Sequence, residues 1–78
     1  MHPSLRQLTS REVERVLLKA GFRMARQAGS HQQFVGFIKG EKRRVTVIAD
    51  KKSFKLSTLK AMIRQSGLSE AEWLTTLK

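Results

Sequence analysis

The chain has 78 residues and a formal net charge of +10, from 16 lysines and arginines against 6 aspartates and glutamates. This length predicts a single domain over residues 1–78 and excludes a multidomain enzyme, because domains typically run to ~100–150 residues. The lack of cysteine excludes a disulfide framework and a thiolate-bound zinc ion, and no stretch approaches the ~20 apolar residues of a membrane-spanning helix. With no apolar signal segment near its start, the protein is expected to be cytoplasmic.

The first predicted element is a helix that begins after Thr9. We expect residues 1–7 to fray, which leaves His2 outside any folded site. Thr9 and Glu12 have the T-x-x-E spacing of a capping box, in which each side chain accepts a hydrogen bond from the other residue's backbone N–H. Gly21 is expected to end the helix. One apolar stripe at helical spacing is formed by Val13, Val16, Leu17 and Ala20.

Three short strands are predicted next, over residues 22–27, 31–38 and 43–49. Residues 28–30 supply the first turn and residues 39–42 the second, and both are short enough for an antiparallel meander. The inward face of the middle strand stays open at this point, because apolar side chains fall on both of its faces. One face carries Phe34, Gly36 and Ile38, and the other Gln33, Val35 and Phe37.

A basic loop over residues 50–56 leads to a second helix, with Ser57 as its expected N-cap and Gly67 at its end. Ser69 and Glu72 form another capping box, which starts a short last helix. The order α-β-β-β-α with a short extra C-terminal helix predicts an α+β fold: a three-stranded antiparallel sheet with helices on one face. The opposite face would stay open to a partner.

The positive charge is concentrated in one part of the chain. Residues 39–64 hold nine basic and two acidic residues, a net of 9 − 2 = +7, whereas residues 65–78 carry a net of −1. Such a density favours a polyanionic partner, because each neutralised phosphate releases counterions. The alternative is a solvated face that keeps a small protein in solution.

His31 is the candidate for chemistry. It follows Gly29 and Ser30 at a predicted tight turn, where the backbone can approach a ligand. A histidine can exchange a proton near neutral pH, although a lone histidine beside Gly-Ser can equally be an ordinary turn residue. The sequence shows no pair of carboxylates, no phosphate-cradling glycine loop, and too few ligands for a dedicated metal cage.

Several segments together resemble one known family, the HicA-type toxins (the YcfA-like family). The resemblance covers residues 9–77, in order and at compatible spacing. The segments that carry it are Gly21-Phe22-Arg23, Arg26-Gln27-x-Gly29-Ser30-His31, Arg44-Val45-Thr46-Val47, Leu56-Ser57-Thr58-Leu59-Lys60 and Ile63-Arg64-Gln65-Ser66-Gly67-Leu68-Ser69.

The resemblance implies a fold like that of double-stranded-RNA-binding domains, and a toxin that cleaves mRNA without the ribosome and is paired with a HicB-like antitoxin. The family's active histidine lies in its Gly-Ser-His motif, which corresponds to His31. The sequence departs from the family at one point. Many members follow the third strand with a proline and a second histidine, where this chain has Val47-Ile48-Ala49-Asp50.

The resulting hypothesis is an mRNA endoribonuclease that uses neither a metal nor another cofactor. His31 would take the proton of a ribose 2′-OH, which DNA lacks, and basic side chains would stabilise the charge on the phosphate. The expected RNA contacts are Lys51, Lys52, Lys55, Lys60, Arg26 and Arg64, with Ser30 as a further phosphate contact.

Two other functions fit the same residues. A non-catalytic RNA-binding module could hold structured RNA by shape with the same basic surface, and the missing second histidine favours it. A subunit that mainly binds its antitoxin would also explain the charge and the small core. No membrane partner is expected, because the helices use their apolar stripes for the core.

Overall fold

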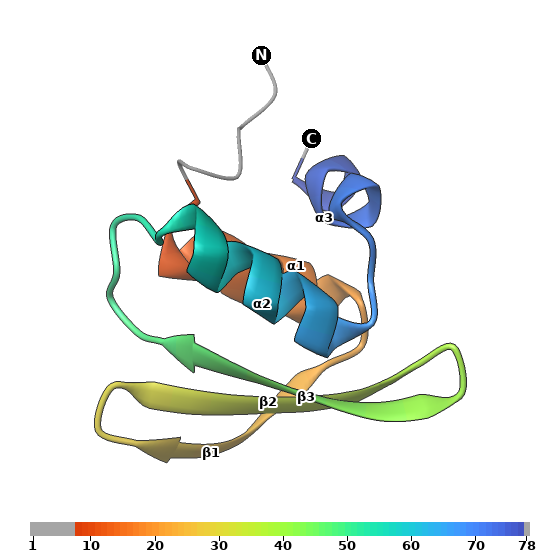
Figure 1. The fold of residues 1–78 in the computed structure, drawn as a ribbon. Coiled ribbons are helices and arrows are strands. Elements are labelled where there is room, and N and C mark those ends of the chain that lie inside the picture. The colour runs from red at the N-terminus through yellow and green to blue at the C-terminus, as the bar shows by residue number, and fades with distance from the viewer. Residues whose placement is uncertain (1–7, 78) are drawn as a thin grey trace.

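The computed structural model describes residues 8–77, which form two layers (Figure 1). The elements in chain order are α1 (Ser10–Lys19), β1 (Arg23–Ala28), β2 (His31–Ile38), β3 (Glu41–Ile48), α2 (Leu56–Ser66) and α3 (Glu70–Thr76). The strands form one antiparallel sheet in the order β1-β2-β3, and α1 and α2 lie across one of its faces. The predicted α+β fold and its element order are confirmed. The predicted fraying of residues 1–7 concerns residues outside the described range.

The capping box predicted for α1 is present. The Thr9 hydroxyl accepts a hydrogen bond from the Glu12 N–H at 3.2 Å, and the Glu12 carboxylate accepts one from the Thr9 N–H at 3.0 Å. Gly21, with φ +100°, follows the C-cap. The Phe22 N–H then donates to the Leu17 carbonyl at 2.9 Å. Phe22 therefore closes the helix instead of starting the first strand, so β1 begins one residue later than predicted.

The two hairpin turns are shorter than predicted. Only Lys39 and Gly40 separate β2 from β3, because Ile38 pairs directly with Glu41. Both turn residues have positive φ, +54° and +83°, as a type I′ turn requires, and this turn matches the twist of the strands it joins. β3 consequently begins at Glu41 instead of at residue 43.

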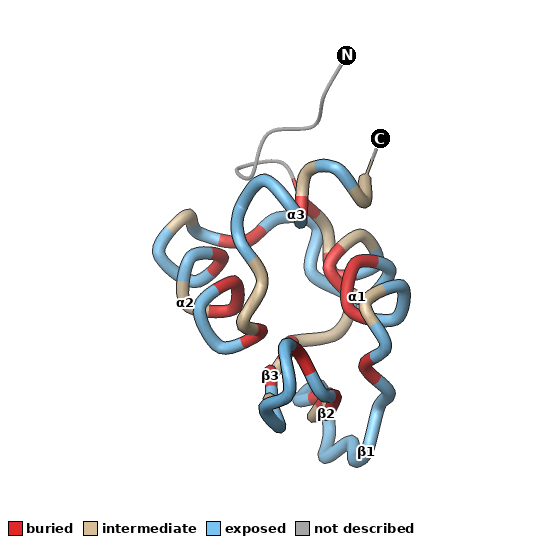
Figure 2. Tube along the Cα trace, turned by 90° about the vertical axis from the view of Figure 1, so that its right-hand side faces the viewer, coloured by how far each residue is buried: buried red, intermediate tan, exposed pale blue. Residues whose placement is uncertain are grey.

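The structure settles which face of β2 is inward. Phe34 and Ile38 face the helices and are buried together with Val45 and Val47 of β3. Figure 2 shows buried stretches on β2, β3, α1 and α2, whereas all of β1 is exposed. The opposite face of the sheet, here called the open face, has no helix over it in the described chain (Figure 1).

The second helix begins earlier than predicted. Lys55 is its N-cap and no side chain caps it, so the prediction of Ser57 as N-cap is wrong. Phe54, just before the cap, is buried in the core, and this burial fixes where the chain turns into the helix. Gly67 ends α2 with φ +79°, and the Ser69–Glu72 capping box of α3 is present, both as predicted.

No helix within residues 8–77 is long and apolar enough to cross a membrane.

Candidate functional site

His31 is the first residue of β2 and is exposed on the open face. The turn before it consists of Gly29 and Ser30, and Gly29 has φ +60°, which glycine adopts without strain. The Ser30 carbonyl accepts a hydrogen bond of 2.7 Å from the Ala49 N–H. This bond holds the start of the β3–α2 loop against the Gly29-Ser30 turn. The turn and the loop together fix the position of the His31 backbone.

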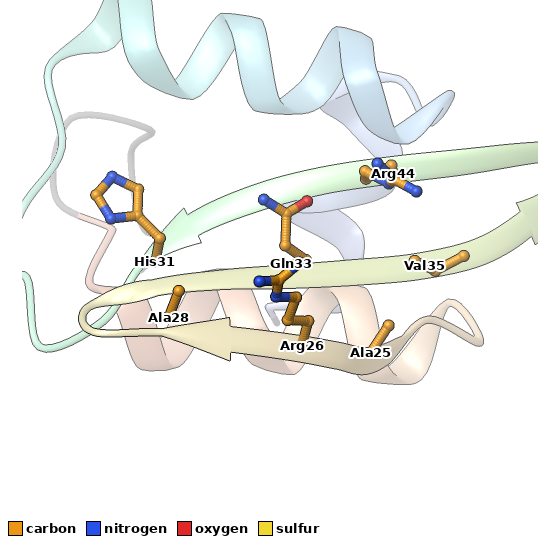
Figure 3. Close-up of a pocket in the computed structure, with 7 residues that line it drawn as sticks. All are labelled: Ala25, Arg26, Ala28, His31, Gln33, Val35 and Arg44. Carbon is orange, nitrogen blue, oxygen red and sulfur yellow. The ribbon is translucent and has the colours of Figure 1, made fainter.

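A shallow depression of about 280 Å³ lies beside His31 on the open face (Figure 3). We call it the His31 hollow. It extends over all three strands, and its lining consists of Ala25, Arg26 and Ala28 of β1, His31, Gln33 and Val35 of β2, and Arg44 of β3. One imidazole and two guanidinium groups therefore share a single surface.

Arg26 belongs to the His31 hollow because of the strand register. Ala28 pairs with His31, and Arg26 pairs with Gln33. Arg26 is thus the diagonal cross-strand neighbour of His31, about 7–8 Å away between backbones, which a long side chain spans. The register shift between Met24 and Arg26 adds a residue to β1 at this point, and such bulges re-aim side chains.

Arg44 is the site residue that the sequence reasoning missed. It pairs with Val35 on the open face, about four residue steps, or ~13 Å, along the sheet from His31. A signal for it exists in the sequence. If Lys39-Gly40 is recognised as a two-residue turn, counting back along both strands pairs Val35 with Arg44.

The open face carries positive charge without nearby acids. Arg23, Arg26, Lys42 and Arg44 all belong to it by register, and no Asp or Glu of the three strands does. Glu41, the acidic strand residue, pairs with inward-facing Ile38, and its carboxylate forms an ion pair of 2.9 Å with Arg43. The field at the open face therefore favours an anion.

Lys51 and Lys52 lie in the loop that leaves β3 and are exposed. The Lys51 carbonyl accepts a hydrogen bond of 2.9 Å from the Ser10 N–H, and its ammonium group is 5.8 Å from the centre of the Phe54 ring. Neither lysine lines the His31 hollow. The bond between Ala49 and Ser30 nevertheless keeps their loop near the end of the sheet that carries His31.

The three remaining predicted RNA contacts belong to the helical layer. Lys55 is the N-cap of α2, and Lys60 and Arg64 are exposed one turn apart on that helix. Since α2 covers the face of the sheet opposite to the open face (Figure 1), the structure does not bring these side chains into the His31 hollow. Within residues 8–77, no three His, Asp or Glu side chains are grouped so that they could hold a metal ion.

Comparison with known protein families gives a match over most of the chain. The family model described as the HicA toxin of bacterial toxin-antitoxin systems matches residues 10–68. This range runs from the start of α1 to the residue after the Gly67 cap, and it includes the whole sheet and the His31 hollow. No curated protein matches the chain.

Proposed function

The chain belongs to the HicA toxin family, and from this premise we propose that it cleaves mRNA with His31 as the general base. It is the toxin of a toxin–antitoxin system, and its partner is a cognate antitoxin. The observation that supports cleavage is the His31 hollow, where a proton acceptor lies on the same open surface as Arg26 and Arg44. Both kinds of group accelerate phosphodiester cleavage, because a base activates the nucleophile and cations stabilise the charge on the phosphate.

In the proposed reaction, an imidazole nitrogen of His31 accepts the proton of a ribose 2′-OH. The 2′ oxygen then forms a bond to the adjacent phosphorus, and the bond from phosphorus to the 5′ oxygen of the next nucleotide breaks. One product ends in a 2′,3′-cyclic phosphate and the other begins with a 5′-OH. DNA is not a substrate, because it lacks the 2′-OH.

Arg26 and Arg44 stabilise the negative charge that develops on the phosphate during this step. A guanidinium stays protonated in proteins, so neither arginine serves as the acid. The resemblance to the family leads one to expect a second histidine after the third strand, where this chain has Val47-Ile48-Ala49-Asp50. We therefore propose that the leaving 5′ oxygen takes its proton from water, and that the hydroxide left behind accepts the proton held by His31.

The other predicted contacts are proposed to bind the RNA backbone outside the reaction centre. Ser30, Lys51 and Lys52 would contact the strand close to His31, since the Ser30–Ala49 hydrogen bond tethers their loop there. Lys55, Lys60 and Arg64 would contact RNA that extends around the edge of the sheet toward α2. Their contribution is electrostatic and decreases with salt.

An RNA-binding module without catalysis is the second candidate. The observation that favours it is the lining of the His31 hollow, in which His31 is the single group suited to proton transfer. Such a module would bind RNA with a strong salt dependence and leave it intact.

The test compares His31→Ala with wild type, and His2→Ala serves as the matched control. Induced in a bacterial host at equal expression, wild type and the control should arrest growth, and His31→Ala should not. The purified toxin, with EDTA and without ribosomes, should release products that end in 2′,3′-cyclic phosphate. Equal growth arrest by His31→Ala, or a strict need for Mg²⁺, would overturn the mechanism; bound but uncleaved RNA would establish the second candidate.

A further inference from the structure

Phe37 is a large apolar side chain left in water on the open face. Its exposed fraction is 71%, compared with 55% for Leu18 and 47% for Met24. A single exposed apolar residue carries no argument by itself. The residues around Phe37 make its exposure informative. Phe37 lies in the same row of β2 as His31, Gln33 and Val35, whose side chains point toward the open face.

Two depressions on the open face share Val35, one beside His31 and one beside Phe37. A second hollow of about 330 Å³ is lined by Arg23, Val35, Phe37 and Lys42, with the backbone of Gly21 and Gly36. Val35 also lines the His31 hollow, so the two depressions are neighbours along β2. Together they form what we call the trough, which follows β2. Six residue steps separate its ends, a distance of about 20 Å.

Cations flank the trough on both sides. Arg23 and Arg26 extend from β1, and Lys42 and Arg44 extend from β3, with Lys42 directly opposite Phe37. The two ion pairs within residues 8–77 involve Lys39 and Arg43, so none of these four cations is neutralised by a carboxylate there. Proteins that bind single-stranded nucleic acid combine these two features, a cationic groove for the backbone and an aromatic ring on which a base stacks.

We propose that the trough binds single-stranded RNA along β2, and that Phe37 stacks on a base several nucleotides from the bond cleaved at His31. This inference rests on the proposed function. It adds that the RNA is single-stranded and that Phe37 contacts one of its bases. A duplex does not fit this role, because its bases are already stacked on one another and present no free face to Phe37. The fold resembles that of double-stranded-RNA-binding domains. The open face of the sheet nevertheless selects a single strand.

Binding is measured in the His31→Ala background so that the RNA stays intact, with a labelled single strand of about 12 nucleotides. Phe37→Ala should weaken binding by roughly 5- to 150-fold, which is the effect of losing one stacked base. Phe37→Tyr should keep the affinity, and Phe37→Leu should lose it as alanine does, because leucine is apolar but cannot stack. Leu18→Ala, which removes an exposed apolar side chain from α1, is the matched control and should bind as the parent does.

A scan of abasic nucleotides locates the stacked base. With Phe37 present, an abasic site should weaken binding strongly at one position, several nucleotides from the scissile bond. In Phe37→Ala the same abasic site should have no further effect, since the ring and the base act as a pair. Equal effects of that site in both proteins would contradict stacking.

The inference is overturned if Phe37→Ala binds the single strand as tightly as its parent, or if a duplex of the same sequence binds equally well and depends on Phe37 equally. Loss of antitoxin binding by Phe37→Ala, with RNA binding intact, would assign the ring to the antitoxin contact and also overturn it. These experiments test RNA binding by the trough separately from RNA cleavage by His31. Wild type that binds through Phe37 but never cleaves overturns only catalysis, and wild type that cleaves while Phe37→Ala binds unchanged overturns only the trough.

Discussion

Gly36 lies so close to Phe22 that a β-carbon at position 36 would be 2.9 Å from Phe22 Cγ and 3.0 Å from Phe22 Cα. This contact brings the chain leaving α1 onto the inward face of β2, the strand that carries His31. Because one of the two atoms belongs to the backbone, rotation of the Phe22 ring cannot relieve the overlap.

Gly36→Ala should therefore destabilise the fold. Overpacking of this kind costs about 1–3 kcal/mol of unfolding free energy, measurable by urea denaturation. Phe22→Ala is the companion change, since it removes Cγ and Cδ2, the two side-chain atoms that obstruct a β-carbon at position 36. The cost of Gly36→Ala should be smaller in that background. A zero cost in the wild-type background would show that the close approach has no energetic weight, and a cost that is unchanged in the Phe22→Ala background would contradict the role given to the Phe22 ring.

Ser66 holds the junction between α2 and α3. Its hydroxyl donates to the Ile63 carbonyl at 2.6 Å and accepts from the Leu68 N–H and the Trp73 indole N–H, each at 3.1 Å. Ser66 and Trp73 are fully buried, so Ser66→Ala leaves a buried indole N–H without its partner. We expect a loss of about 1–3 kcal/mol in unfolding free energy. Ser57→Ala, on the exposed first turn of α2, is the control and should have little effect.

Glu72 gives the stability a defined pH dependence. Hydrogen bonding to the Ser69 backbone N–H, followed by that to the Ser69 side chain and the charge of Lys39, lowers the pKa of the Glu72 carboxyl. A lowered pKa means that the folded state prefers the charged form, so this stabilisation is present at neutral pH. It is lost as the pH falls through the lowered pKa.

Urea unfolding of wild type and Glu72→Gln at several pH values checks this linkage. Wild type should be the more stable protein near neutral pH, and the difference should shrink as the medium becomes acidic. The other carboxyl groups titrate in both proteins, so the difference isolates Glu72. A difference that stays constant over the whole pH range would contradict the assignment.

The helix ends could be predicted from the sequence because their causes are local. A capping box needs residues three apart, and Thr9 with Glu12 supplies one on any fold. The start of α2 could not be found in this way. There the burial of Phe54 decides where the helix begins, and that burial depends on the sheet and on α1.

The site was predictable in part for a similar reason. His31 is marked by its own short motif. The partnership with Arg44 depends on strand register, which in turn depends on Lys39 and Gly40 both adopting positive φ. Lysine rarely takes that conformation, so the sequence alone favours the longer connection over residues 39–42. The separation of Lys60 and Arg64 from His31 could not be predicted either, because charge density along a chain does not say on which layer a residue lies.

This separation gives the sharpest mutational test of the site. Arg44→Ala should lower the cleavage rate constant by about 100-fold, as expected for a group that stabilises charge in the transition state. Lys60→Ala removes a cation from the helical layer and should leave that rate constant unchanged, with a modest, salt-dependent loss of RNA affinity. Each lost backbone contact should reduce the slope of log affinity against log salt by about 0.7 for a single strand.

Single-turnover cleavage at saturating enzyme measures the chemical step alone, and thermal unfolding of both variants establishes that they fold as wild type does. Arg44→Lys adds a further control, because it keeps the charge and loses the planar guanidinium. Partial recovery would indicate that charge matters more than bidentate geometry. If Lys60→Ala slowed the chemical step as much as Arg44→Ala, the reaction would have to take place near α2, and the His31 hollow would no longer account for it.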